Sequence, residues 1–394
     1  MDDKNKILLT IGLYHAFNDG SVVVIPLLFP IFKALFDLSY TQVGVITGGG
    51  LLIVLITQIF IGRISDQKNF RTLLSIGILL LSASMLLITQ TQGFLTLLLF
   101  IFIVRFSSSF YHPIGIGWVS RTFKKDRIDR GMGIQSALGD FGAFVAILTT
   151  LYIAELKGWA FPFYIWSIIG IGILFYGTYL THNINKEFLT IENNNKIRQT
   201  SKEAISEAWM IIKRIKTLIP GFIISGAAWG VIVSYLPLLL DERTTLPLTT
   251  IGMIVSIWIG IGVIACFLYE KIQILLGRRT TLIFGYFTMG VMSLGLSVFT
   301  NIAILLLIMV FLGISTFITF PAMFSYVSEI TQKQVEAKTF GYILTLQLGG
   351  GTILLFLSGV FSDILNIGVP FIILGVLSLL VAVILVGNRN KNIV

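Results

Sequence analysis

Ionisable side chains inside apolar stretches are the residues of this chain best suited to chemistry. Five of them lie in the first half of the chain: His15, Asp19, Arg105, His112 and Asp140. Because a charge in the hydrocarbon core of a membrane is costly, such residues usually bind an ion or a charged substrate. A carboxylate can accept a proton, an arginine can hold an anion, and a histidine changes its charge near neutral pH. The apolar stretches of the second half have no ionisable residue in their interiors.

The elements that position these residues are predicted to be membrane-spanning helices. Hydrophobic residues make up 55% of the 394 residues and charged residues only 12%, whereas a soluble domain is about a quarter charged. Apolar runs of about 20 residues, the length of a transmembrane helix, recur along the whole chain. We count twelve, at roughly 8–30, 42–62, 72–90, 94–119, 131–154, 159–181, 217–240, 248–269, 280–299, 301–327, 340–361 and 368–387. The composition therefore predicts an all-α membrane protein with twelve transmembrane helices.

The distribution of positive charge predicts the orientation of these spans. With both termini in the cytoplasm, the outer segments hold only Lys33, Lys157 and Arg243 of the 28 lysines and arginines, and Arg105 lies inside a span. Such an excess on one side is typical of cytoplasmic loops. The net charge of +9 thus indicates membrane topology and contact with anionic lipid rather than a nucleic-acid partner.

An internal repeat divides the chain into two related halves. Residues 38–180 align weakly, without a gap, with the chain 208 positions later, and scarce residues match at this offset. The matches include Pro113 with Pro321, Pro162 with Pro370, Thr41 with Thr249, Arg71 with Arg279, and Gly142 with Gly350. Two halves in one orientation are a common plan of secondary transporters. We predict a six-helix bundle over 1–181, a cytoplasmic linker over 182–216 and a second six-helix bundle over 217–394.

Helix geometry predicts which ionisable residues share a depth in the membrane. At about 1.5 Å per residue, Asp19 and Arg105 fall near the midplane. His15 and His112 fall together closer to the cytoplasm, and Asp140 also lies towards that side. We therefore expect an ion pair between Arg105 and Asp19. An anionic substrate would compete with Asp19 for the arginine, and protonation of Asp19 would break the ion pair. The alternative is a permanent structural ion pair, and the histidines either relay protons or stay neutral and hydrogen-bonded.

A motif after the second span resembles the signature of the major facilitator superfamily. That signature reads Gly-x-x-x-Asp-Arg-x-Gly-Arg-Arg, and Gly62, Asp66 and Arg71 match it, whereas Gln67 and Asn69 depart from it. The twelve spans in two parallel halves also resemble this family along nearly the whole chain. The resemblance implies alternating access, a central cavity lined by helices 1 and 4, and a cytoplasmic gate formed by the three matching residues. The alternative is that they are ordinary loop residues.

A finer resemblance is to the fosmidomycin-resistance-type exporters. The run Phe-Tyr-His-Pro-Ile-Gly at 110–115 is similar to their Phe-His-Pro-Glu-Gly run, and residues 130–136 also fit that branch. His15 followed by Asn18 and Asp19 fits it as well, which adds Asn18 to the candidate site.

Two departures from that branch bear on substrate and coupling. Ile114 replaces its glutamate, and residues 143–150 lack the Gly-Pro pair that many antiporters carry.

The linker and the second half give further predictions. Within 182–216, an apolar pattern from Ile205 to Ile212 predicts a short amphipathic helix at the cytoplasmic surface, with an extension of the next span as the alternative. For the second half of the cavity wall we select Trp229, Tyr235 and Gln347, from a group that also contains Trp258 and Tyr342.

The function predicted from these features is secondary active transport. The predicted form is proton-coupled efflux of a small drug or metabolite, with an anionic compound as one candidate for the substrate. Uptake by proton symport or by facilitated diffusion is the alternative. Functions of other classes are also considered: a receptor that does not transport its ligand, and a lipid-modifying enzyme that uses Ser107–Ser109 beside His112.

No nucleotide-binding, metal-binding or hydrolase motif is present in the sequence. We therefore expect no enzyme activity, cofactor, metal or nucleic acid. We expect a monomeric multi-pass protein of the cell membrane, whose partners are a small molecule, lipid and protons or another coupling ion.

Overall fold

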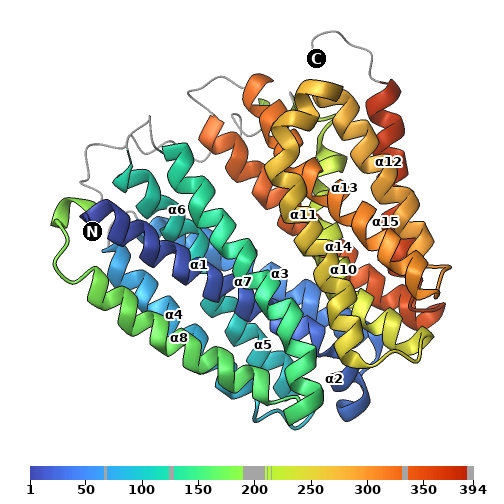
Figure 1. The fold of residues 1–394 in the computed structure, drawn as a ribbon, viewed down its shortest axis with the longest axis horizontal. Coiled ribbons are helices and arrows are strands. Elements are labelled where there is room, and N and C mark those ends of the chain that lie inside the picture. The colour runs from blue at the N-terminus through green and yellow to red at the C-terminus, as the bar shows by residue number, and fades with distance from the viewer. Residues whose placement is uncertain are drawn as a thin grey trace. The chain divides into compact units, whose positions relative to one another are not determined.

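The computed structural model describes residues 1–65, 69–123, 128–189, 209–210, 212–213, 215–330 and 336–387. All regular elements in these ranges are helices (Figure 1), which confirms the predicted all-α class. Eleven helices, α5 and α6 counting together as one, are long and apolar enough to cross a membrane, and each coincides with a predicted span. The remaining predicted span, 280–299, is also helical, but its helix begins with two arginines and two threonines.

The helix boundaries of the two halves are as follows. The first half contains α1 (Asp3–Leu27), α2 (Phe29–Phe36), α3 (Tyr40–Ser65), α4 (Phe70–Ile88), α5 (Phe94–Ser108), α6 (Tyr111–Thr122), α7 (Ile128–Lys157), α8 (Phe161–Leu180) and the short η1 (Lys186–Phe188). The second half contains α10 (Ile219–Arg243), α11 (Leu248–Leu276), α12 (Arg278–Leu296), α13 (Ile302–Ile330), α14 (Glu336–Ile364) and α15 (Val369–Gly387). The predicted linker, 182–216, falls largely outside the described residues, so its amphipathic helix stays a prediction.

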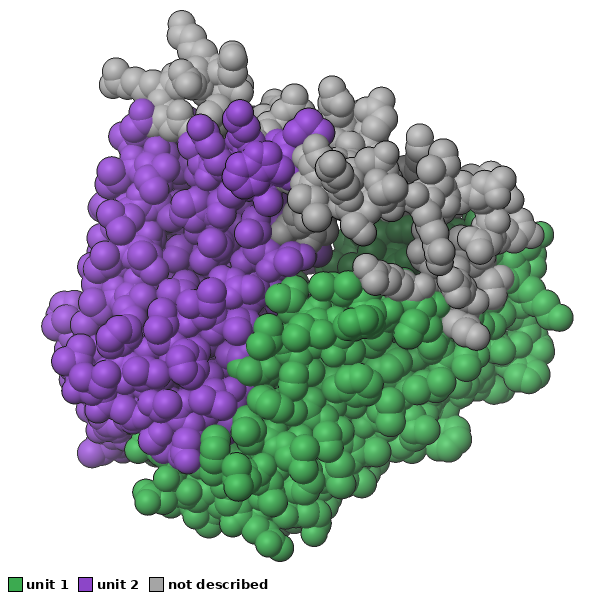
Figure 2. All heavy atoms as spheres, turned by 180° about the vertical axis from the view of Figure 1, so that it is seen from behind, with its two compact units in different colours: residues 1–38, 49–196, 247–252 green, residues 39–48, 197–246, 253–394 purple. Residues whose placement is uncertain are grey.

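The chain forms two compact units, coloured separately in Figure 2. Unit 1 consists of residues 1–38, 49–196 and 247–252, and unit 2 of residues 39–48, 197–246 and 253–394. Each unit therefore contains the first turns of one helix whose remainder belongs to the other unit, namely α3 in unit 2 and α11 in unit 1.

Small residues allow the helices of unit 1 to pack closely around α1. This helix lies along α7 and α8. A side chain at Gly142 of α7 would overlap the backbone of Ala16 in α1, and one at Gly20 of α1 would meet the ring of Trp166 in α8. Glycine at such positions lets two helix backbones approach each other. This close packing fixes the position of α1, the helix that carries His15 and Asp19.

The fourth span is interrupted just before Pro113. Its first part, α5, ends at Ser108, and its second part, α6, begins at Tyr111. Pro113 has no N–H to donate to the carbonyl of Ser109, so the helix cannot continue unbroken. The hydroxyls of Ser108 and Ser109 donate hydrogen bonds to the backbone carbonyls of Arg105 and Phe106. Arg105 and His112 consequently lie on opposite sides of a bend rather than along one face of a straight helix.

Candidate functional site

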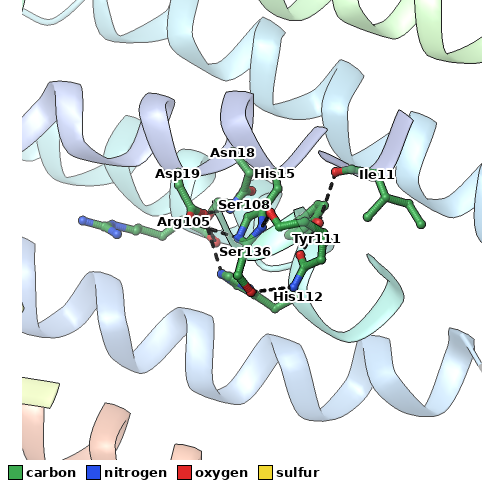
Figure 3. Close-up of polar contacts among 10 residues, drawn as sticks. Ile11, His15, Asn18, Asp19, Arg105, Ser108, Tyr111, His112 and Ser136 are labelled. Atoms are coloured by element: carbon green, nitrogen blue, oxygen red, sulfur yellow. Dashed lines mark hydrogen bonds and ion pairs between the residues drawn. The ribbon is translucent and has the colours of Figure 1, made fainter. Parts of the chain in front are cut away.

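Two histidines and an aspartate meet inside unit 1 (Figure 3). Nε2 of His15 lies 3.1 Å from Oδ2 of Asp19, and both residues belong to α1. Nε2 of His112, from α6, lies 3.8 Å from Oδ1 of the same carboxylate. The two imidazole rings are 5.3 Å apart and nearly perpendicular. The structure thus brings together three of the residues selected from the sequence.

The ring of His15 is held in one orientation by its surroundings. Its Nδ1 lies 2.8 Å from the backbone carbonyl of Gln135, and since a carbonyl only accepts, Nδ1 carries the proton and donates. The ring of Tyr111 stacks on it at 4.3 Å. A side chain at Gly139 would come within 2.7 Å of three atoms of the imidazole. Together these contacts direct Nε2 of His15 towards Asp19.

The carboxylate of Asp19 is oriented from its other side. Nδ2 of Asn18 donates a hydrogen bond of 3.0 Å to Oδ1, so Oδ2 is left to face His15. In a neutral His15 that donates from Nδ1, Nε2 carries a lone pair, and a carboxylate oxygen carries lone pairs too. Two such acceptors 3.1 Å apart repel each other unless a positive charge lies between them. The arrangement is therefore suited to hold a cation.

Arg105 does not join this cluster, and the predicted Arg105–Asp19 ion pair is wrong. Among the described residues its side chain makes no ion pair or hydrogen bond, and its Nε is buried without a partner. The side chain packs against Gly50 of α3, where an added methyl would lie 3.0 Å from its Cγ. Figure 3 shows the guanidinium extending away from Asp19 and His112. An equal predicted depth in the membrane does not determine the directions in which two side chains extend.

Asp140 of α7 is the remaining ionisable residue of the candidate site. No hydrogen bond or ion pair links its side chain to another residue in the described ranges. Its carboxylate interacts electrostatically with Asp19 and His15, so it adds negative charge to the surroundings of the cluster.

The three residues of the predicted gate have different outcomes. Asp66 lies outside the described residues, so the latch stays a prediction. Gly62 lies in α3, where an added methyl would be 3.8 Å from Cβ of Pro113. Nη1 of Arg71 donates hydrogen bonds of 2.6 and 3.2 Å to the carbonyls of Thr181 and His182 at the end of α8.

The role of Arg71 in closing a helix end was missed in the sequence, although a signal for it exists. Its repeat partner, Arg279, likewise donates to the carbonyls of Leu385 and Val386 at the end of α15. Because both halves use the aligned arginine in the same way, this contact stabilises helix ends in each of them.

The candidates of the second half lie in unit 2. Trp229 of α10 lies 5.0 Å from Trp258 and 5.8 Å from Phe317, measured between ring centroids. Tyr235 is buried, and its hydroxyl donates to the carbonyl of Leu355 at 2.8 Å. Gln347 is also buried, and its Nε2 has no hydrogen-bond partner among the described residues.

Two curated proteins are similar to parts of this chain. One is an uncharacterised MFS-type transporter, YfnC, of Bacillus subtilis (strain 168), 29% identical over 109 residues, which is 28% of this chain and 27% of that protein. The other is the riboflavin transporter RibZ of Clostridioides difficile (strain 630), 25% identical over 171 residues, which is 43% of this chain and 37% of that protein. The matched stretches therefore span well under half of either relative.

Solved structures share the whole fold at low sequence identity. A bacterial homologue of the human lysosomal transporter Spinster, in an inward-facing and unoccupied conformation, has a TM-score of 0.76 at 14% identity, covering 99% of this chain and 96% of that one. The nucleoside transporter NupG has a TM-score of 0.75 at 13% identity, covering 98% and 99%. The sequence also matches the model of a protein family, the Major Facilitator Superfamily, over residues 11–351 and 218–393. This chain therefore belongs to the Major Facilitator Superfamily.

Proposed function

We propose that this protein is a secondary transporter that moves a small anionic compound across the cell membrane by alternating access. The observation that carries the proposal is the side chain of Arg105, which lies in a membrane-spanning helix without an acidic partner among the described residues. An unpaired guanidinium in such a place is costly and points to a function. A carboxylate or phosphate of the substrate would supply the missing partner, with two parallel hydrogen bonds.

Membership of the superfamily supports the transport part of this proposal. Both curated relatives are named as transporters, and so are the two structural neighbours described above. Export is the direction implied by the resemblance to the fosmidomycin-resistance-type exporters. In this proposal Gly62, Asp66 and Arg71 belong to the cytoplasmic gate, while Trp229 and Gln347 contribute to the substrate site.

The coupling ion that we propose is a proton, carried by Asp140. This carboxylate lies in the membrane-spanning part of α7 and is without a hydrogen bond or ion pair in the described part of the chain. A proton on it removes a charge from apolar surroundings and reduces the repulsion from Asp19. Binding and release of that proton would favour different conformations of the transporter, which is the requirement for coupling.

A ligand screen on purified protein tests the anion site. Thermal unfolding is measured with a panel of neutral and anionic metabolites, including riboflavin and its 5′-phosphate, which differ by a phosphate group. A ligand at about 100 times its Kd stabilises its target by about 2.7 kcal/mol. We expect an anionic compound to stabilise the parent protein but not Arg105→Ala.

The control variant is Arg130→Ala, which removes an exposed arginine at the start of the seventh helix. It should respond to the ligand like the parent. If anionic ligands stabilise Arg105→Ala as much as the parent, Arg105 is not the anion site. If the ligand is not transported by proteoliposomes, the transport proposal itself fails.

A further inference from the structure

We propose that His15, Asp19 and His112 bind a divalent first-row transition-metal cation such as Zn²⁺ or Co²⁺. One ligating atom from each of the three residues lies within 4.8 Å of the other two. His15 and Asp19 come from α1 and His112 from α6, which is far away in the chain. The three residues therefore do not form one short sequence motif. The inference concerns cation binding and goes beyond transport of an anion, so either can fail without the other.

The donor set matches the chemistry of these metals. Two imidazole nitrogens and one carboxylate oxygen are preferred by Zn²⁺, Co²⁺, Ni²⁺ and Fe²⁺. Mg²⁺ and Ca²⁺ prefer sites made wholly of oxygen. The site should therefore discriminate between these two groups of cations.

The distances are close to those that a bound ion requires. Ligands about 2.1 Å from a tetrahedral metal lie about 3.4 Å from one another. Nε2 of His15 lies 3.1 Å from Oδ2 of Asp19, and Nε2 of His112 lies 3.8 Å from Oδ1. With one ligating atom taken from each residue, all three atoms lie within 4.8 Å of one another. The His112 side chain is 43% exposed, so its ring has room to turn towards the ion. Three protein ligands leave a further position for water or for an anion bound to the metal.

Outer contacts prepare the ligands as they do in known metal sites. A ligating histidine usually donates its other N–H to a carbonyl or carboxylate, which fixes the tautomer. His15 does this from Nδ1 to the carbonyl of Gln135. Its Nε2 is buried and faces Oδ2 of Asp19 at 3.1 Å. The carboxylate of Asp19 is oriented by accepting a hydrogen bond at Oδ1 from Nδ2 of Asn18.

The charges around the site favour a divalent cation. Asp19 contributes one negative charge, and Asp140 interacts electrostatically with Asp19 and His15. Arg105 extends away from the cluster (Figure 3). Tyr111 stacks on His15 and directs its hydroxyl to the oxygens of Ile11 and Gln135. The carboxylate of Asp19 would thus balance part of the charge of a divalent ion, and the guanidinium of Arg105 does not extend towards that carboxylate.

Titration with Co²⁺ tests this inference on the full-length protein. The protein is purified in detergent with an affinity tag that contains no histidine, and the visible absorption of Co²⁺ reports nitrogen and oxygen coordination. We expect saturation at one Co²⁺ per chain, displacement by Zn²⁺, and no displacement by Mg²⁺ or Ca²⁺. His112→Ala and Asp19→Asn should weaken binding by at least about tenfold, since even changes to outer-shell residues produce losses of that size.

His182→Ala is the matched control, because His182 is exposed and pairs with Asn183 outside the cluster. It should bind Co²⁺ like the parent. The deciding variant is His112→Ala, because the half-exposed ring can be removed with little risk to folding, which size-exclusion chromatography verifies. If the parent protein shows no saturable Co²⁺ absorption, or His112→Ala binds as tightly as the parent, the proposed metal site is wrong.

Discussion

Glu155 and Asp363 stand 208 residues apart, the offset of the internal repeat, and each carboxylate caps the first turn of a helix. Oε2 of Glu155 accepts hydrogen bonds from the amide and the hydroxyl of Thr249, at 2.8 and 2.6 Å. Asp363 accepts from the amides of Tyr40 and Thr41, at 2.8 and 2.7 Å. Since Thr41 and Thr249 are themselves a repeat pair, the weak sequence repeat corresponds to a repeated structural contact, made once within each compact unit.

Removing either cap should loosen only the helix end that it holds. Asp363→Ala deprives the amides of Tyr40 and Thr41 of their acceptor, and a lost cap costs about 1 kcal/mol. We expect hydrogen exchange of these two amides to become about fivefold faster, because local opening controls that rate. Glu155→Ala should accelerate exchange at Thr249 instead.

The two variants serve as controls for each other. Exchange at Thr249 should be unchanged in Asp363→Ala, and exchange at Thr41 unchanged in Glu155→Ala. Equal acceleration at both positions in either variant would show that the caps do not act locally.

Much of the fold follows from the sequence because the membrane imposes it. A backbone in hydrocarbon must satisfy its hydrogen bonds within the protein, and an apolar run of about 20 residues does this as a helix, so length and hydropathy give the spans. The bend before Pro113 follows as well, because a missing N–H acts on its own helix. The capping roles of Arg71 and Asp363 were not predicted, since the atoms that they bind lie far away in the chain.

The site was only partly predictable, for a related reason. Depth along the helices brought His15 and His112 to one level, and the structure places both of them against Asp19, which had been assigned to the level of Arg105. The partner assigned to Asp19 was wrong, because the bend after Ser108 and the small Gly50 let Arg105 extend in another direction. Residue spacing reports position along a helix, whereas the direction of a long side chain depends on the neighbours that surround it.

Gly142 should be among the least replaceable residues of α7. A methyl there would overlap the backbone of Ala16 in α1, and backbone cannot move aside as a side chain can. Overpacking of this kind costs about 1–3 kcal/mol. We expect Gly142→Ala to lower the thermal stability of the protein. We also expect it to displace α1, the helix that carries His15 and Asp19.

Gly133→Ala is the control on the same helix, because an added methyl would meet no described residue of another helix within 4 Å. It should be neutral or stabilise the protein by up to about 1 kcal/mol, as expected for replacing a helical glycine by alanine. Similar stabilities of the two variants would contradict the close α1–α7 contact.

Asp140→Asn should separate substrate binding from proton coupling. The amide keeps the size of the carboxylate but cannot carry the transported proton. In proteoliposomes, a pH gradient should drive accumulation of substrate by the parent but not by Asp140→Asn, while exchange of substrate down its own gradient continues. The ligand-induced thermal shift should be retained. A variant that still accumulates substrate under a pH gradient would exclude Asp140 as the proton carrier.

Trp229 and Trp258 should respond differently to truncation, although their rings are in contact. Trp258 is fully buried, and its Nε1 donates to Thr316 at 3.5 Å, so Trp258→Ala should cost about 3–5 kcal/mol of stability. Trp229 is partly exposed. Because we propose that it contributes to the substrate site, Trp229→Ala should lose less stability but weaken ligand binding by about tenfold, a change worth about 1.4 kcal/mol. Thermal unfolding with and without ligand measures both effects. Equal destabilisation of the two variants, with unchanged ligand affinity in Trp229→Ala, would show that Trp229 only fills the space between α10 and its neighbours.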